Sequence, residues 1–400
     1  MKFINTPLIK IITGIRRSGK SSVLTLISES IVESGIESDR IVYLNMESLE
    51  NSRFKDILEL NSFIREKYAL HNAPVYLFID EVQEIPQWER AVNSFLSDTV
   101  ADIFISGSNS GLLSGELASH LTGRYVEFSV YPLTYSEFCM FRKNSHIDRQ
   151  PTSDFHFMEF VKYGGFPGLH RLVFSDETIY QYLSSLSDSI LLKDVVMRNN
   201  VRDVALLRSL LIFLADNCGN IFSARSVADY MKKKRRSLGI ETIYNYISYL
   251  EAALVIYRIS RYDIKGKRLL ETQEKYYLAD LGLRHALLGY REKDIGIFLE
   301  NIVCIELKKR GYIIHIGKLD DYEIDFIAIR GNDKMYIQVA YLIADEATHE
   351  REFRPLRLIA DNYPKYVLSM DTTPPGNTEG IIRMYLPDFL LSDGEKDPIH

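Results

Sequence analysis

Cysteine is scarce in this chain: the 400 residues include only three, Cys139, Cys218 and Cys304, which lie far apart. An odd number of widely spaced cysteines argues against a disulfide framework and against a cysteine-based zinc site, and it fits a reducing cytoplasm. No apolar run approaches the roughly 20 residues that a transmembrane helix needs, and the first residues lack the small-residue cleavage site of a signal peptide. These features predict a soluble cytoplasmic protein with no membrane partner.

Positive charge is not in excess either. The chain has 48 Lys and Arg against 54 Asp and Glu, a net charge of -6, so any contact with nucleic acid requires a local basic patch. The hydrophobic content of 46% and charged content of 26% are typical of globular proteins and exclude a collagen-like or wholly disordered chain. At roughly 100–200 residues per domain, the length predicts two to four domains.

The first 135 residues alternate short apolar runs with longer amphipathic segments. Because this alternation is typical of a parallel sheet covered by helices on both faces, residues 1–135 are predicted to form one α/β domain. The predicted strands are residues 8–12, 41–45, 75–79, 102–106 and 125–130, and the predicted helices are residues 20–33, 58–68, 88–97 and 111–121.

The rest of the chain divides by the period of its apolar residues. Residues 136–200 are predicted to be a helical lid, with helices at 154–163 and 177–199. Residues 201–285 show the order of a winged helix-turn-helix, with three helices and then a hairpin of strands at 255–262 and 268–278. Residues 286–392 return to an α/β pattern, and residues 393–400 form a polar tail that is expected to fray.

The clearest motif lies between the first predicted strand and helix and fits G-x-x-x-x-G-K-[ST]. Glycines at both ends of such a loop let backbone N–H groups turn inward and cradle the phosphates of a nucleotide. Lys20 is then placed to reach the β- and γ-phosphate oxygens, and the Ser21 hydroxyl is placed to bind Mg²⁺. The alternative is a Gly-Lys-Ser turn without a ligand. The predicted nucleotide-binding residues are Gly14, Ile15, Arg16, Arg17, Ser18, Gly19, Lys20, Ser21 and Ser22.

Two acidic residues, Asp80 and Glu81, follow the apolar run at 75–79. In a parallel sheet the carboxyl end of a strand faces the ligand crevice, so Asp80 is predicted to hold Mg²⁺. Glu81 is predicted to polarise the water that attacks the γ-phosphate. The alternative is a solvent-exposed acidic turn after a core strand.

Two further candidates lie beyond these acids. Ser108 or Asn109 follows the strand at 102–106 and is placed to sense the γ-phosphate, although a helix N-cap at Asn109 or Ser110 explains the same residues. Arg124, just before the strand at 125–130, is a candidate arginine finger that stabilises charge on the γ-phosphate. An ordinary ion-paired surface arginine is the alternative.

Several segments together resemble a family of prokaryotic AAA-like ATPases of the ORC-related, archaeal-ATPase type, whose members carry a C-terminal domain similar to PD-(D/E)XK nucleases. The resemblance implies an ASCE-type P-loop core in which Lys20, Ser21, Asp80 and Glu81 have the roles given above. It also implies a first sensor at or beside Asn109, and ATP rather than GTP. The segments are GIRRSGKSS, FIDEVQEIPQWE, ISGSNSGLL, TGR, YPLTYSEF, YGGFP, KDVVMRN, TIYNYISYLEAALVI, KYYLADLGL, LENIV, EIDFI and IQVAYL.

A basic run at residues 232–236 lies between two helices of the predicted winged helix. Together with the wing it forms a candidate DNA-binding edge, although charge runs are often merely solvated and winged helices also bind proteins. The other residues of this edge are Tyr244, Asn245 and Tyr249 on the second helix and Arg258, Arg261, Lys265, Lys267 and Arg268 on the wing.

The nuclease-like segment departs from the pattern that it resembles. Glu300 and Asp325 match two expected acids, but Gln338 replaces a carboxylate and Ala340 replaces the lysine. Glu323 lies on the same strand face as Asp325 but cannot replace that lysine. Because Mg²⁺ prefers anionic oxygen ligands, this domain is predicted to be inactive.

The combined prediction is an α/β protein with a parallel-sheet P-loop NTPase core, a helical lid, a winged helix and a C-terminal restriction-endonuclease-like domain. We expect a Mg²⁺-dependent ATPase that hydrolyses ATP to ADP and phosphate to drive a conformational change, with DNA and a second copy of the chain as possible partners. The alternatives are a non-hydrolysing nucleotide-dependent switch and a DNA-binding regulatory protein with a degenerate nuclease domain.

Overall fold

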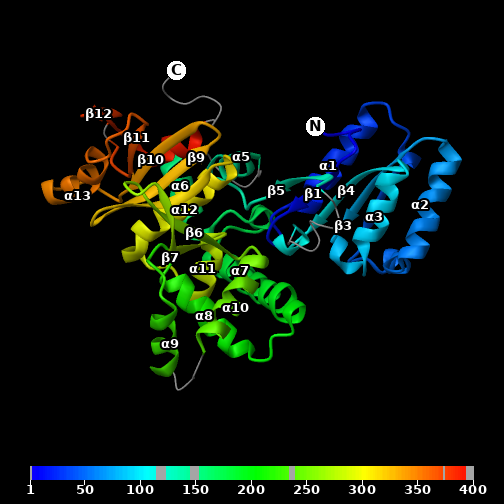
Figure 1. Cartoon of the computed structure of the whole chain (residues 1–400), viewed down its shortest axis with the longest axis horizontal. Coiled ribbons are helices and arrows are strands. Elements are labelled where there is room, and N and C mark those ends of the chain that lie inside the picture. The colour runs from blue at the N-terminus through cyan, green and yellow to red at the C-terminus, as the bar shows by residue number, and fades with distance from the viewer. Residues whose placement is uncertain (1, 114–122, 145–152, 234–238, 373, 393–400) are drawn as a thin grey trace. The chain divides into compact units, whose positions relative to one another are not determined.

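The computed structural model describes residues 2–113, 123–144, 153–233, 239–372 and 374–392 (Figure 1). It contains two compact units, Met1–Val130 with Ala252–Leu254, and Tyr131–Glu251 with Val255–His400. Within the described ranges, the helices are all too short or too polar to cross a membrane.

The first unit contains a five-stranded sheet in which every pair of neighbouring strands is parallel, as predicted. The strand order is β2-β3-β4-β1-β5, so β4 separates the strand that precedes the glycine-rich loop from the strand that ends in Asp80. All five strands nevertheless end at the same edge. The strands are β1 (Ile9–Thr13), β2 (Ile41–Asn45), β3 (Val75–Asp80), β4 (Ala101–Gly107) and β5 (Tyr125–Ser129), and the helices are α1 (Lys20–Glu33), α2 (Ile57–His71) and α3 (Trp88–Ser97).

Successive residues of β3 point to opposite faces of this sheet, as the period of two requires. Leu77 and Ile79 pack with α2 and α3 on one face, while Phe78 packs with Leu24 of α1 on the other. The Phe78 ring stacks on Phe104 of β4 with 4.6 Å between centroids. Both faces are therefore covered, and the sheet is a rigid base for the loops at its carboxyl edge.

The second unit is built on a mixed eight-stranded sheet with the order β12-β13-β11-β10-β9-β8-β6-β7. Helix α12 packs on one face through Phe298 and Val303, and α13 packs on the other through Phe353 and Leu356. The strands are β6 (Ile256–Asp263), β7 (Arg268–Leu278), β8 (Ile313–Leu319), β9 (Tyr322–Arg330), β10 (Asp333–Val339), β11 (Lys365–Ser369), β12 (Gly376–Thr378) and β13 (Ile381–Tyr385). The α-helices are α5 (Tyr135–Asn144), α6 (Ser153–Tyr163), α7 (Asp176–Ser189), α8 (Val204–Asp216), α9 (Ala224–Lys233), α10 (Ile240–Ala252), α11 (Leu281–Leu288), α12 (Ile295–Lys309), α13 (Glu346–Arg357) and α14 (Leu386–Leu391).

The structure differs from the predicted domain boundary at residue 285. The predicted wing, β6 and β7, is part of the same sheet as the nuclease-like segment, because β6 pairs in parallel with β8 through Arg261 and Ile316. A strand edge with unpaired backbone groups requires a partner, and this partner lies about 50 residues further along the chain. The wing and the C-terminal segment therefore belong to one unit.

Several other elements differ from the predictions. The predicted helix at 111–121 is a short 3-10 turn, Ser110–Leu113, followed by residues outside the described ranges. The apolar pattern predicts a helix at residues 351–361, but α13 begins at Glu346 because the Asp345 side chain caps it, accepting a hydrogen bond of 2.7 Å from the Thr348 amide. The structure adds α5, α11, α14, β12 and β13, which the sequence patterns did not predict.

Candidate functional site

The glycine-rich loop joins β1 to α1 in a tight turn. A Cβ atom on Gly14 would lie 2.2 Å from the carbonyl oxygen of Val130, so no other residue fits there. Arg17 and Gly19 have positive φ angles of 67° and 109°. Alternating backbone handedness of this kind turns successive N–H groups toward a common centre.

Two polar features suit the loop to a ligand. Gly19, which precedes α1, provides no side-chain cap, and the N–H groups at the amino end of an uncapped helix form an anion-binding site. The Ser18 hydroxyl is 3% exposed, and its Oγ has no hydrogen-bond partner within the described part of the chain. A buried unsatisfied hydroxyl costs about 1–3 kcal/mol, so the loop is suited to a ligand that supplies polar atoms.

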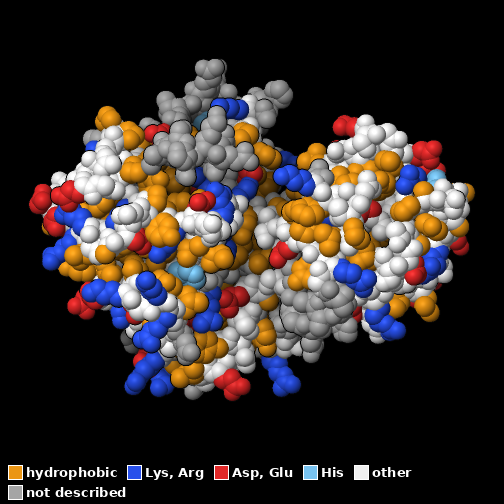
Figure 2. All heavy atoms as spheres, turned by 45° about the horizontal axis from the view of Figure 1, so that its top comes forward, with side chains coloured by type: hydrophobic (Ala, Val, Ile, Leu, Met, Phe, Trp, Pro, Cys, Tyr) orange, Lys and Arg blue, Asp and Glu red, His pale blue; other side chains and the backbone are white. Residues whose placement is uncertain are grey.

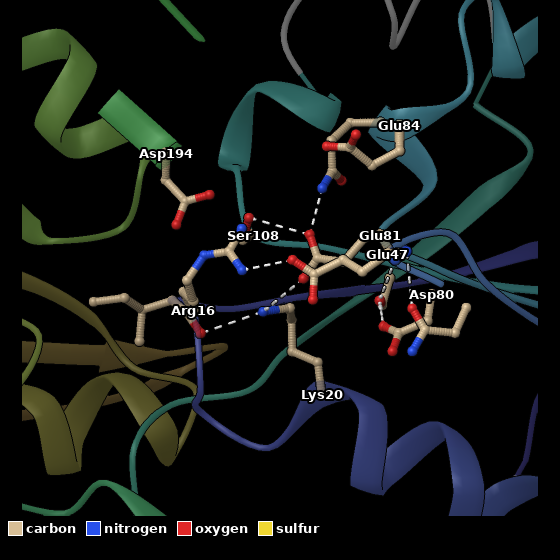
Figure 3. Close-up of polar contacts among 12 residues, drawn as sticks. Arg16, Lys20, Glu47, Asp80, Glu81, Glu84, Ser108 and Asp194 are labelled. Carbon is tan, nitrogen blue, oxygen red and sulfur yellow. Dashed lines mark hydrogen bonds and ion pairs between the residues drawn. The ribbon is translucent and has the colours of Figure 1, made fainter. Parts of the chain in front are cut away.

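Lys20 and Glu81 point toward each other beside this loop (Figure 3). The Lys20 Nζ lies 3.8 Å from the Glu81 Oε1 and donates to the Ile15 carbonyl at 3.3 Å. Both side chains are buried, whereas Ser21 and Ser22 are exposed on the first turn of α1. A buried ammonium at the amino end of a helix is suited to bind polyphosphate.

The two acids are anchored by serines of the neighbouring strand. The Ser106 Oγ donates to Asp80 and accepts a 3.2 Å hydrogen bond from the Glu81 amide. The Ser108 Oγ donates to the Glu81 Oε2 at 3.3 Å. Glu81 itself has φ 58° and ψ 54°, the left-handed region that a non-glycine residue seldom adopts. The acids therefore occupy fixed positions, and strained backbone of this kind is concentrated at functional sites.

Most of the predicted site residues meet at the carboxyl edge of the first sheet: the loop from Gly14 to Ser22, Asp80, Glu81 and Ser108. Two arginines of the loop differ in their surroundings, since Arg16 pairs with Glu47 at 2.8 Å and Arg17 is exposed. The Asn109 Oδ1 accepts from the Gly111 amide at 2.5 Å, which is the capping turn given above as the alternative to a sensor.

Arg124 lies at the opposite edge of the same sheet. Its carbonyl accepts a hydrogen bond from the Ile9 amide, at the start of β1. The five residues of β1 span roughly 16 Å at about 3.3 Å each. The structure therefore does not bring Arg124 to the glycine-rich loop of its own chain.

Sequence reasoning missed two residues of this site, Ser106 and Gln83. Ser106 is fully buried and contacts both acids. Gln83 donates from its Nε2 to the Glu81 Oε2. A serine near the end of one strand and a glutamine two residues after an acid carry no motif of their own, and the contacts depend on the packing of β3 against β4.

A second polar cluster lines a hollow of about 500 Å³ in the second unit, around Glu300, Asp325, Gln338 and Ala340. The Gln338 Oε1 accepts from the Asp325 amide at 2.7 Å, and its Nε2 donates to Glu352 at 3.2 Å. Gln338 therefore uses both ends of its amide within the protein.

Lys275 of β7 lies in the same cluster, although Ala340 stands where the motif has its lysine, two residues after Gln338. Its Nζ lies 2.7 Å from the Glu323 Oε1 and 3.8 Å from the Glu300 Oε2. Burial opposes its charge, but the surrounding carboxylates outweigh that effect and raise the pKa of Lys275. Burial, followed by the charge of Glu300, raises the pKa of Asp325 well above its usual value. The loss of nuclease activity remains a prediction.

The basic residues predicted for the DNA-binding edge have mixed surroundings. Arg258 lies 3.7 Å from Glu274, and Lys265 lies 2.5 Å from Asp320. Arg261 is buried and donates to Gln273. Lys232 is exposed, whereas residues 234–236 of the basic run lie outside the described ranges. On the face drawn in Figure 2, Lys and Arg side chains are interspersed with Asp and Glu.

The sheet order and the loop geometry define a P-loop nucleotide-binding fold. Comparison with known proteins agrees, because the family described as AAA domain matches residues 6–139. A second family, described as a domain of unknown function, matches residues 154–294.

Two relatives are similar to this chain over most of its length. An uncharacterised protein of Haemophilus influenzae is 40% identical over 98% of this chain and 96% of its own length. An uncharacterised protein of Methanocaldococcus jannaschii is 32% identical over 86% of this chain and 77% of its own length. The chain therefore belongs to the same family as these relatives, and its residues 6–139 form an AAA-like P-loop domain.

Among solved structures, AMPPCP-bound DnaA from Aquifex aeolicus is similar over 60% of this chain and 81% of that protein, with 14% identity and a TM-score of 0.32. Such a loose superposition says nothing further about this chain.

Proposed function

We propose that the first unit binds MgATP at the carboxyl edge of its sheet and hydrolyses it to ADP and phosphate, thereby driving a conformational change. One observation carries this proposal: the Lys20 ammonium and the carboxylates of Asp80 and Glu81 lie beside a loop whose buried Ser18 hydroxyl has no hydrogen-bond partner among the described residues. Together these groups supply what a polyphosphate with a bound divalent cation requires.

Each side chain has a distinct task in this proposal. The loop amides and Lys20 bind and orient the β- and γ-phosphates. Ser21 and Asp80 hold Mg²⁺, which when bound withdraws charge from the phosphate oxygens. Glu81 holds the attacking water and accepts its proton. The Ser106 hydroxyl keeps the two acids in place for these tasks.

Binding and turnover are tested with Lys20→Ala. We expect calorimetry to show MgATP binding to the wild type and a loss of affinity of at least tenfold in the variant, together with loss of phosphate release. Lys55→Ala is the control, since Lys55 is an exposed lysine of the same unit. Equal MgATP affinity in Lys20→Ala and Lys55→Ala refutes the site.

A non-hydrolysing nucleotide-dependent switch uses the same pocket and is the main alternative. The buried position of Glu81 beside Lys20 favours hydrolysis, because a switch needs no base at that point. Wild-type protein that binds MgATP but releases no phosphate, with or without duplex DNA, establishes the switch instead.

Arg124 can act as a finger only on the nucleotide of a second copy, since it lies at the opposite edge from its own loop. We therefore propose a homo-oligomer in which Arg124 completes a neighbouring site. Lys20→Ala and Arg124→Ala should each be inactive alone, and a mixture should recover part of the wild-type turnover. If the turnover of the mixture is no greater than that of Lys20→Ala mixed with itself, this role of Arg124 is contradicted.

DNA binding through residues 232–236 and the wing is a second proposal, favoured by the exposure of Lys232, Lys267 and Arg268. Affinity for duplex DNA should fall steeply with salt, because each phosphate contact releases counterions. Neutralising residues 232–236 should reduce both the affinity and the salt slope. An unchanged affinity removes this patch from consideration.

A further inference from the structure

Gln83 lies in the 3-10 turn Val82–Glu84, directly after Glu81. Its Nε2 donates a hydrogen bond to the Glu81 Oε2. Because a carboxylate only accepts hydrogen bonds, the NH₂ group of the amide must face Glu81, and the orientation of the amide is thereby fixed. The opposite end of the amide, Oε1, is buried and has no partner within the described residues.

The two oxygens of Glu81 have different surroundings. Oε2 accepts from both Gln83 and Ser108, whereas Oε1 faces the Lys20 ammonium at 3.8 Å. The left-handed backbone of Glu81 costs about 1–3 kcal/mol, and it begins the turn that brings Gln83 back against the carboxylate. The amide therefore restrains rotation of the carboxylate, and its own oxygen remains an acceptor without a donor.

Hydrolysis requires a water molecule with both hydrogens directed. One hydrogen points to the base, so that an oxygen lone pair faces phosphorus, and a second acceptor fixes the other hydrogen. A misplacement of about 1 Å costs roughly 100-fold in rate. An unpaired amide oxygen beside the base offers the second acceptor, and leaving that oxygen buried without a donor is unfavourable.

We propose that Gln83 orients the attacking water, holding the Glu81 carboxylate through its amide NH₂ and accepting the second hydrogen of the water through its amide oxygen. This inference rests on the proposed hydrolysis of ATP. In the step itself the water oxygen forms a bond to the γ-phosphorus, and the bond from that phosphorus to the β,γ-bridging oxygen breaks. The electron pair of the broken bond leaves with ADP, and one water proton passes to Glu81.

The test compares Gln83→Met and Gln83→Glu with the wild type. Gln83→Met keeps the length of the side chain but neither donates to Glu81 nor accepts from water, so kcat should fall about 100-fold while KM for ATP stays within threefold. Gln83→Glu places a second carboxylate beside Glu81. Because adjacent carboxylates resist being ionised together, the acid limb of the kcat–pH profile should move to higher pH. A purely structural role of Gln83 would lower the Tm or the MgATP affinity of Gln83→Met together with kcat, whereas loss of water orientation lowers kcat alone.

Glu84→Gln is the matched control, because Glu84 lies in the same turn but is exposed; its kcat and pH profile should match the wild type. The MgATP affinity and Tm of each variant report whether it folds, and Gln83→Asn replaces Gln83→Met if the latter does not. Wild-type kcat and pH profile in the Gln83 variants overturn the role of Gln83 and leave the nucleotide site intact. MgATP binding without any turnover of the wild type overturns both hydrolysis and this role.

Discussion

Replacing Glu81 with glutamine should change binding and catalysis in opposite directions. The Glu81 Oε1 lies 3.8 Å from the Lys20 Nζ, so a polyphosphate must compete with this carboxylate for the ammonium. At this separation two unit charges attract each other by about 1 kcal/mol in water and by about 4 kcal/mol at an effective dielectric constant of 20. Glutamine removes that competition and also removes a negative charge that repels the γ-phosphate.

The lower of these two energies already predicts that MgATP binds at least about fivefold more tightly to Glu81→Gln, since 1.4 kcal/mol corresponds to a factor of ten. Turnover should fall by about 10²- to 10⁴-fold, the usual contribution of a general base. Isothermal titration calorimetry measures the affinity, and phosphate release at saturating MgATP measures kcat. The amide of the variant keeps an oxygen that accepts from Gln83, so the local turn should be preserved.

Glu84→Gln removes a charge from the same turn without facing Lys20 and should alter neither quantity. Turnover of Glu81→Gln equal to that of the wild type refutes the assignment of Glu81 as the base. An affinity that stays the same or weakens refutes the competition between Glu81 and phosphate, whatever happens to kcat.

Three further predictions concern stability and metal binding. Ser106→Ala removes the hydroxyl that contacts both the Glu81 amide and the Asp80 carboxylate, so urea denaturation should show a loss of about 1–3 kcal/mol. In calorimetry, Mg²⁺ should then increase the affinity for ATP less than it does in the wild type. Burial, followed by the Arg142 charge, lowers the pKa of His170 to about 4; its stabilising effect is therefore present above pH 6.5 and lost as the pH falls toward 4. His170→Phe should remove that loss, so that between pH 7 and pH 4 the variant loses about 2 kcal/mol less stability than the wild type in urea denaturation. Equal pH dependence of the two proteins contradicts the assignment. Lys275→Met should cost up to about 3 kcal/mol in the same assay, because the partly buried carboxylates of Glu300 and Glu323 lose their partner.

The P-loop core could be predicted because its signals are local. Strand β2 and helices α1 and α3 coincide with the predicted residue ranges, and the other strands of that sheet differ by one residue at one or both ends. Each of these segments carries its own apolar period and is bounded by turn residues. The glycine-rich loop and the acids after β3 are also contiguous motifs, and parallel strands bring their carboxyl ends to one edge whatever the strand order.

Contacts between segments remote in sequence could not be predicted. The pairing of β6 with β8 depends on which strand edge remains open after the chain folds, and neither segment records its partner. Helix α11 was missed because it is only eight residues long and its start depends on Asp280, whose side chain caps Gly282 and also accepts from the Gly165 amide. Such a cap connects two loops that lie more than 100 residues apart.

Lys275 shows that a charge missing from a sequence motif can be supplied by a residue elsewhere in the chain. Ala340 removes the expected lysine, yet β7 supplies an ammonium to the same acids although β7 does not pair with β9 in the sheet. If Lys275 serves only as their counter-charge, removing one of those acids should offset the loss of the lysine. The double variant Lys275→Met with Glu323→Gln should then recover at least half of the stability that Lys275→Met loses. Without such recovery, the coupling of Lys275 to this cluster comes through Glu300 and Asp325, the other carboxylates that raise the pKa of Lys275.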